Sequence, residues 1–143
     1  MMLSQPCKRC WLQSCICHAL EPVHTNLEFV VIRHWKESKK SSNSARIADI
    51  CLPNLRVVEY PNEIDEITDI DPLTDAVLYP PKDQYPIMKA PPKRLFVLDG
   101  SWKQARKMRN RIKVIKPLPS IALYPSSSPP PRISANLRNA ELE

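Results

Sequence analysis

Four of the five cysteines lie within eleven residues near the start of the chain, in the pattern Cys-x2-Cys-x4-Cys-x-Cys. Four thiolates are the number of ligands that a closed tetrahedral zinc site requires. Disulfides are the structural alternative, but an intracellular chain keeps such thiols reduced. His18 and His24 are nearby substitutes for any cysteine that does not bind. The spacing therefore predicts a structural Zn²⁺ site with these ligands: Cys7, Cys10, Cys15 and Cys17.

The second candidate for chemistry is Asp99-Gly-Ser-Trp102, which joins an apolar segment to a basic one and contains the only glycine of the chain. An ionised carboxylate at the carboxyl end of a strand can act as a general base or bind an N–H or hydroxyl of a ligand. The positive end of a following helix favours the ionised form. Because Asp-Gly is also a common turn sequence, the residues alone leave Asp99 either a catalytic base or a turn residue.

A basic helix follows this motif. Ser101 and Gln104 have the spacing of a capping box, which predicts a helix that begins at Ser101. Its apolar residues recur at helical spacing and form the face expected to pack on the sheet: Trp102, Ala105, Met108 and Ile112. Five cations occupy other positions, with no acid among them: Lys103, Arg106, Lys107, Arg109 and Arg111. This pattern favours contact with a phosphate backbone over a plain solvated face.

The elements that position these residues follow from the apolar runs. Five runs predict strands, at residues 27–32, 55–60, 76–79, 94–98 and 120–124. A short helix is expected from residue 43 or 44 to Leu52, and the acidic stretch 63–75 is expected to be a surface connection or an irregular helix. Strands that alternate with helices indicate an α/β fold with a mostly parallel sheet.

Three of these strands end in comparable sequences, Leu78-Tyr-Pro-Pro81, Leu98-Asp-Gly-Ser-Trp102 and Leu123-Tyr-Pro125. Because ligands of open α/β sheets bind beyond the carboxyl ends of the strands, these ends are expected to form the walls of a pocket. Their aromatic rings can stack on a flat base, or they can simply pack the rim of the sheet. The residues after this point, 125–132, are rich in serine and proline and predict an extended tail.

Composition narrows the function further. The 143 residues carry a formal net charge of +6, which is typical of proteins with polyanionic partners, nucleic acid first. Composition alone leaves an ordinary solvated basic surface equally open. One glycine against sixteen prolines excludes a glycine-rich phosphate loop and the dinucleotide fingerprint. No apolar run approaches the roughly 20 residues of a membrane span, and no signal peptide is visible. We therefore expect a cytoplasmic protein with no membrane partner.

Together these motifs resemble the DTW-domain family, the tRNA-uridine aminocarboxypropyltransferases. The cysteine cluster resembles the one that opens the family, and His34, Glu37 and Asn43-Ser-Ala-Arg46 match the loop and helix start that follow its first strand. Leu78-Tyr-Pro80 matches a strand end, and Asp99-Gly-Ser-Trp102 matches the naming motif Asp-x-Thr-Trp, with serine keeping the hydroxyl of threonine. A related family that modifies ribosomal RNA is similar over the same stretch. The match covers residues 7 to about 125.

The resemblance implies an activity and a set of roles. The family transfers the 3-amino-3-carboxypropyl group of S-adenosylmethionine to N3 of a uridine in tRNA, so tRNA, and not DNA, is the expected partner. Its fold is expected to be SPOUT-like, which holds S-adenosylmethionine without a glycine-rich loop. Asp99 would accept or orient the N3 proton. The co-substrate would be held by the strand ends and the motif: Leu78, Tyr79, Pro80, Gly100, Ser101 and Trp102.

The same resemblance implies how the chain is divided. Residues 1–24 are expected to be a cysteine-rich zinc-binding segment and residues 25–143 the DTW α/β domain. Family members continue into a Ser/Thr-x-Glu segment and further helices, whereas this chain stops at Ala140-Glu-Leu-Glu143, so we expect a C-terminally truncated domain. Two other functions fit the residues: a non-catalytic, zinc-containing RNA-binding module and a SPOUT-type RNA methyltransferase.

Overall fold

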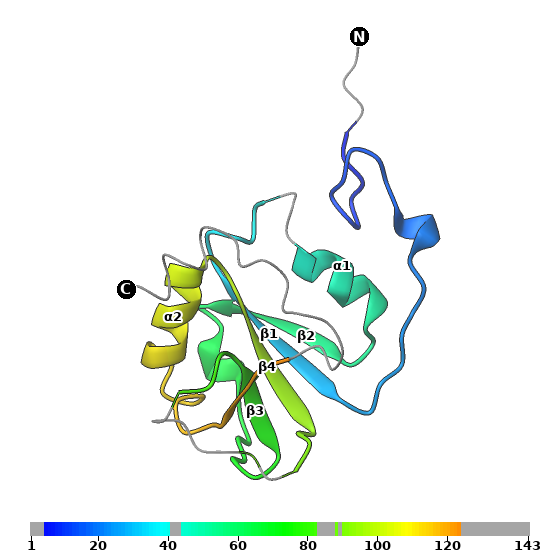
Figure 1. Ribbon diagram of the computed structural model, residues 1–143. Helices are drawn as coiled ribbons and strands as arrows, with labels where there is room; N and C mark the ends of the chain where they lie inside the picture. Colours follow the sequence, from blue (N-terminus) through cyan, green and yellow to red (C-terminus); the bar gives the residue numbers. More distant parts are fainter. Residues whose placement is uncertain (1–4, 41–43, 83–87, 89, 124–143) are drawn as a thin grey trace, which may run out of the picture.

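A computed structural model describes residues 5–40, 44–82, 88 and 90–123 of the chain (Figure 1). Within these ranges the two α-helices are α1 (Ser44–Cys51) and α2 (Trp102–Arg111), and the two short 3₁₀ helices are η1 (Cys17–Ala19) and η2 (Ile64–Glu66). The strands are β1 (Glu28–His34), β2 (Leu55–Tyr60), β3 (Asp75–Leu78), β4 (Arg94–Asp99) and β5 (Ser120–Ile121). No helix in this described part is long and apolar enough to cross a membrane.

The strands form one parallel sheet in the order β2-β1-β4-β3-β5. This confirms the α/β fold with a parallel sheet that the apolar runs predicted. Strand β1 extends past the predicted end at Ile32, because Arg33 and His34 remain paired with Glu59 and Tyr60 of β2. Strand β5 ends at Ile121, earlier than predicted, and the rest of the expected segment from Tyr124 through the tail 125–132 lies outside the described residues.

Helices α1 and α2 cover opposite sides of the sheet, as Figure 1 shows. Side chains of successive strand residues point to alternate faces, so each strand supplies residues to both sides. The α1 side contributes fewer buried side chains, among them Val31, Ala76 and Leu95. The main core is on the α2 side and contains these buried residues: Val30, Ile32, Val58, Val77, Phe96, Ala105, Met108, Ile112, Ile115 and Leu118.

Helix α2 begins with the predicted capping box. The Ser101 hydroxyl accepts a hydrogen bond from the Gln104 backbone N–H at 3.2 Å, and the Gln104 side-chain oxygen accepts one from the Ser101 N–H at 2.8 Å. Such a cap stabilises a helix by about 1 kcal/mol. Gly100 does not have a positive φ, but a Cβ on it would lie 2.8 Å from that Gln104 oxygen. A side chain at position 100 would therefore displace the capping side chain of Gln104.

The acidic stretch 63–75 is partly a surface connection containing η2, as expected, but its last carboxylate is buried. Asp75 is 3% exposed and pairs in register with Arg94 on β4. The Asp75 carboxylate accepts a hydrogen bond from Arg94 at 2.6 Å and raises the pKa of that guanidinium. This ion pair connects β3 and β4 at the amino ends of the strands, away from the edge where the candidate site lies.

Candidate functional site

The strand order places a topological switch point between β1 and β4. These two strands are neighbours, but the chain leaves β1 toward β2 on one side and leaves β4 toward β5 on the other. In open α/β sheets, ligands bind in the crevice outside the carboxyl ends of two such strands. At this switch β1 ends with His34, and Asp99 of β4 lies opposite Arg33. The Asp-Gly-Ser-Trp motif is thus at the position where the fold favours a ligand site.

A small cavity of about 110 Å³ opens beside the motif, on the α2 side of the strand ends. Five of the six residues predicted to hold the co-substrate line it: Leu78, Tyr79, Pro80, Gly100 and Trp102. Leu98, from the strand end that was expected to form a pocket wall, also lines it, as does Ala105, for which the sequence indicated only a helix-core role. Pockets for small ligands are usually about 300–1,000 Å³, so this cavity alone is too small to enclose such a ligand.

Two predicted residues do not line this cavity. Ser101 has its hydroxyl engaged in the helix cap. Asp99 is the last residue of β4, and strand alternation directs its side chain to the face opposite that of Leu98, the face of its register partner Arg33. The carboxylate and the apolar cavity therefore approach the strand ends from different sides of the sheet.

His34 is a residue at this edge that the sequence analysis did not select as a site residue. Its ring lies 5.9 Å from the ring of Trp35 and 5.9 Å from that of Tyr60, between centroids, and its Cβ is 3.5 Å from where a Gly100 Cβ would be. The Lys36 backbone N–H donates to His34 Nδ1 at 3.2 Å. A neutral imidazole that accepts at Nδ1 carries its proton on Nε2. The resemblance of His34 and Glu37 to the loop after the first strand of the DTW-domain family was the sequence signal that could have selected His34.

The pKa of His34 supports this protonation state. Desolvation by partial burial lowers the pKa, and the positive charges of Lys36 and Lys107 lower it further, although Glu37 acts in the opposite direction. His34 is therefore neutral at pH 7 and presents an N–H donor at the edge where Asp99 presents a carboxylate.

Only some of the cations on α2 are exposed to solvent. Lys103, Lys107 and Arg111 are exposed and Arg106 is half-buried, as a binding face requires. Arg109 is 0% exposed, so its assignment to an RNA-binding surface was wrong. It falls one turn after Ala105 and one residue after Met108, which puts it on the helix face that packs into the core.

Arg109 instead anchors the segment between α2 and β5. Its guanidinium donates to the carbonyl of Ile115 at 2.8 Å and to that of Leu118 at 2.7 Å. It also donates to the hydroxyl of Ser120 at 3.0 and 3.2 Å. Buried charge is tolerated when its donors are satisfied, and these acceptors fix the path of the chain into β5.

The four N-terminal cysteines converge as predicted. The sulfur atoms of Cys7, Cys10, Cys15 and Cys17 all lie within 4.8 Å of one another, and those of Cys7 and Cys17 are 3.9 Å apart. Four sulfurs around one Zn²⁺ at about 2.3 Å would be roughly 3.8 Å apart, so the donor set and its spacing fit this ion. Backbone N–H groups of Arg9 and Cys17 donate to the sulfurs of Cys7 and Cys15, at 3.4 and 3.5 Å.

The ionisation of the cluster also suits a cation. The N–H groups of Cys10 and Arg9 lower the pKa of Cys7 to about 6, because they stabilise the thiolate. Desolvation and the neighbouring sulfurs raise the pKa of Cys17 to about 12, because further negative charge is unfavourable there. A divalent metal ion removes this conflict, since it stabilises all four thiolates together.

Trp11 connects the cysteine segment to α1. Its indole ring lies 3.4 Å from the guanidinium carbon of Arg46, measured to the ring centroid, which is a stacked cation–π contact. Further along, the Val23 N–H donates to the carbonyl of Cys51 at 2.7 Å. The segment therefore packs on the side of the sheet that α1 covers.

These features define an α/β protein with a parallel sheet, a candidate ligand site at the carboxyl edge of that sheet and four N-terminal cysteines that could hold a metal ion. A comparison with known protein families matches residues 4–139 to the DTW domain. The chain therefore belongs to the DTW-domain family, the tRNA-uridine aminocarboxypropyltransferases, and this membership is consistent with a role in tRNA modification. No solved structure matches the chain.

Proposed function

We propose that this protein transfers the 3-amino-3-carboxypropyl group of S-adenosylmethionine to N3 of a uridine in tRNA. The observation that carries the proposal is the position of the family's Asp-x-(Thr/Ser)-Trp motif at the topological switch point of the sheet. A fold position that favours ligands and a family motif that carries a carboxylate meet there. Reduced thiols and a tRNA substrate both favour a cytoplasmic location.

The reaction requires little covalent chemistry from the protein. N3 forms a bond to the methylene carbon beside the sulfonium, the carbon–sulfur bond breaks, and its electron pair remains on sulfur as methylthioadenosine leaves. Because the sulfonium is already an activated leaving group, the protein mainly orients the reactants and takes up the N3 proton. Asp99 is the proposed acceptor of this proton, and the Nε2–H of His34 is a suitable donor for a uridine carbonyl oxygen.

The other roles are distributed around the same edge. The residues proposed to bind S-adenosylmethionine are Leu78, Tyr79, Pro80, Gly100 and Trp102, whose cavity is suited to its apolar and aromatic parts, with Ser101 holding the motif through the helix cap. The exposed or half-exposed cations proposed to contact tRNA phosphates are Lys103, Arg106, Lys107 and Arg111. Zn²⁺ in the cysteine cluster is proposed to be structural, since four protein ligands leave no open position.

A labelling experiment tests this function. The full-length protein is incubated with unmodified tRNA and S-adenosylmethionine that carries label either on the carboxyl carbon or on the methyl group. We expect carboxyl label, and not methyl label, in the RNA. Methyl label alone would identify an RNA methyltransferase, and binding without either label would identify a non-catalytic RNA-binding module.

The role of Asp99 is tested by Asp99→Asn, which removes the base and keeps the size of the side chain. Loss of a general base is expected to lower the transfer rate by about 10²–10⁴-fold. Asp65→Asn is the matched control, because Asp65 is exposed on η2, far along the chain from the motif. Full transfer activity in Asp99→Asn would remove Asp99 from the mechanism.

A further inference from the structure

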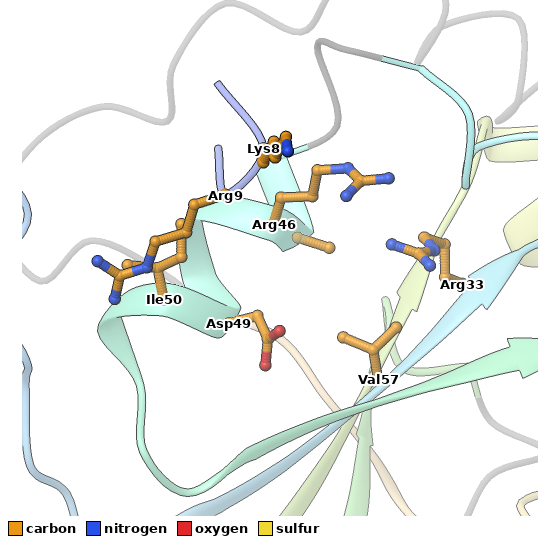
Figure 2. Close-up of a pocket in the computed structure, with 8 residues that line it drawn as sticks. Lys8, Arg9, Arg33, Arg46, Asp49, Ile50 and Val57 are labelled. Carbon is orange, nitrogen blue, oxygen red and sulfur yellow. The ribbon is translucent and has the colours of Figure 1, made fainter. Parts of the chain in front are cut away.

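A second, larger pocket of about 500 Å³ lies on the α1 side of the sheet, where the cysteine segment approaches α1 (Figure 2). None of the residues to which the family resemblance assigned a binding role lines this pocket. Four of its lining side chains are cations and one is a carboxylate, Asp49. The complete lining comes from the cysteine segment, β1, α1 and β2: Lys8, Arg9, Arg33, Ala45, Arg46, Asp49, Ile50 and Val57.

Two arginines form the inner part of this pocket. Figure 2 shows the guanidinium groups of Arg33 and Arg46 pointing toward each other, one from β1 and the other from α1. The Nε atoms of both are buried and have no hydrogen-bond partner among the described residues. A buried donor without a partner costs about 1–3 kcal/mol, and more when the group is charged.

The two charges also oppose each other. The pKa of Arg46 is lowered by burial and by the charge of Arg33. Arg46 is nevertheless held in position, because its guanidinium stacks on Trp11 and donates to the Ser38 carbonyl at 2.8 Å. Two like charges that are partly buried and incompletely hydrogen-bonded, one of them held in position, favour an anion between them.

We propose that this pocket binds a phosphate group of the RNA backbone, an inference that rests on RNA being the substrate under the proposed function. Lys8 and Arg9 are exposed at the outer side of the pocket, so a continuous polyanion can contact them while one phosphate contacts the inner arginines. A small anion would use the inner pair alone. Arg33 also pairs in register with Asp99, which places the phosphate site next to the proposed base at the switch point.

The test measures the affinity of the full chain for tRNA as a function of salt, in Arg33→Gln and in the charge-retaining Arg33→Lys. Between about 50 and 200 mM KCl, we expect Arg33→Gln to weaken binding by roughly tenfold or more and to reduce the slope of log K against log salt by about one. Arg33→Lys is expected to keep the slope and to lose part of the affinity, because a lysine keeps the charge without the planar fork.

Arg56→Gln is the matched control, since it removes the same charge from an exposed position near the amino end of β2. It is expected to change neither the slope nor the affinity beyond about twofold. An equal effect of Arg56→Gln and Arg33→Gln would reduce the pocket to part of a general basic surface and would overturn the proposal.

Two further measurements separate other occupants. The first is the affinity of Arg33→Gln for S-adenosylmethionine, measured by calorimetry without RNA. If this affinity falls and tRNA binding is unchanged, the pocket binds the carboxylate of the co-substrate. Stabilisation by inorganic phosphate that depends on Arg33, with an unchanged salt slope for tRNA, would assign it to free phosphate. Either result would overturn the proposal.

Failure of the proposed function is recognised separately. In one outcome, the wild-type chain transfers no aminocarboxypropyl group and still binds RNA with a salt slope that depends on Arg33. That result would support the phosphate pocket and contradict the proposed enzyme activity. Transfer of the group together with a salt slope of tRNA binding that does not depend on Arg33 would support the enzyme activity and contradict the phosphate pocket.

Discussion

Arg109 and the pair Arg33 and Arg46 all have atoms withdrawn from solvent, but the fold satisfies their hydrogen-bond donors to different degrees. Arg109 is completely buried, and its guanidinium donates to two carbonyls and one hydroxyl of the segment that leads into β5. Arg33 and Arg46 each keep a buried Nε without a partner among the described residues, and they face each other across a pocket. The first arrangement stabilises the fold, and the second leaves binding capacity for a ligand.

The largest expected effect in this comparison comes from Arg109→Met. The substitution keeps the volume of the side-chain stem but leaves the carbonyls of Ile115 and Leu118 buried without their donor, so the free energy of unfolding is expected to fall by about 3 kcal/mol. Chemical denaturation monitored by circular dichroism measures it. The matched control is Arg111→Met, at an exposed position of the same helix.

The two variants should differ in opposite ways. Arg111→Met is expected to change stability by less than about 0.5 kcal/mol, because exposed substitutions usually do, and to weaken binding to tRNA. Arg109→Met is expected to retain the salt slope of the wild type while it remains folded. Equal stability of the two variants would contradict the structural role of Arg109.

Metal removal is expected to affect the arginine pocket and spare the Arg109 region. A zinc chelator releases the four cysteines, so the adjoining Lys8, Arg9 and Trp11 lose their fixed positions beside Arg46. We expect one zinc ion per chain before treatment and a loss of tRNA affinity of about tenfold or more after it, with the salt slope reduced by about two.

Circular dichroism provides the control for this experiment, because α2 and the sheet form a core that does not include the cysteines. Most of the helical signal should remain after chelation. Absence of zinc from freshly reduced protein would contradict the metal site. Unchanged tRNA binding after chelation would show that the cysteine segment does not contribute to binding at the pocket.

The sequence predicted the scaffold well because local rules determine it. Apolar runs predicted the five strands, and the spacing of Ser101 and Gln104 predicted the start of α2 and its capping box. The four cysteines were found because ligand type and spacing alone indicate a zinc site. Strand ends were also sufficient to select most of the residues that line the small cavity at the carboxyl edge.

The arginines were harder to predict, because their roles depend on partners that are distant in the sequence. Counting charges along α2 placed Arg109 on the surface, whereas the face it shares with Ala105 and Met108 determines that it is buried. The pocket of Arg33 and Arg46 exists only because β1 and α1 meet and Trp11 stacks on one of the arginines. No pattern within one segment contains that information.

Asp49→Asn changes the charge of the arginine pocket in the opposite direction from Arg33→Gln. Asp49 is the carboxylate that lines the arginine pocket, and removing its charge raises the positive potential there. We expect tRNA to bind about two- to fivefold more tightly at low salt, with the gain lost as salt is raised. Asp65→Asn, exposed on η2, is the control and should change the affinity less. Weaker binding by Asp49→Asn would mean that the carboxylate itself contacts the ligand.

His34 offers the smallest effect and concerns a group that the fold keeps neutral instead of charged. Its folded pKa lies below the ordinary histidine value of 6.5, chiefly because of partial burial. The unfolded chain therefore binds more protons than the folded chain as the pH falls below about 7. The contribution of neutral His34 to the free energy of unfolding is fully present above the pKa of the unfolded state. It should decrease as the pH falls below that value toward the pKa of the folded state.

The measurement is the free energy of unfolding from pH 7.5 to 5, in wild type and in His34→Gln, which cannot titrate there. The wild type should lose more stability than the variant over this interval, and a parallel pH dependence would show that His34 is not desolvated at the edge of the sheet. The sign also matters for the proposed chemistry. A histidine that charges only below neutral pH remains a hydrogen-bond donor at the same edge of the sheet as Asp99, without competing for the proton that Asp99 is proposed to accept.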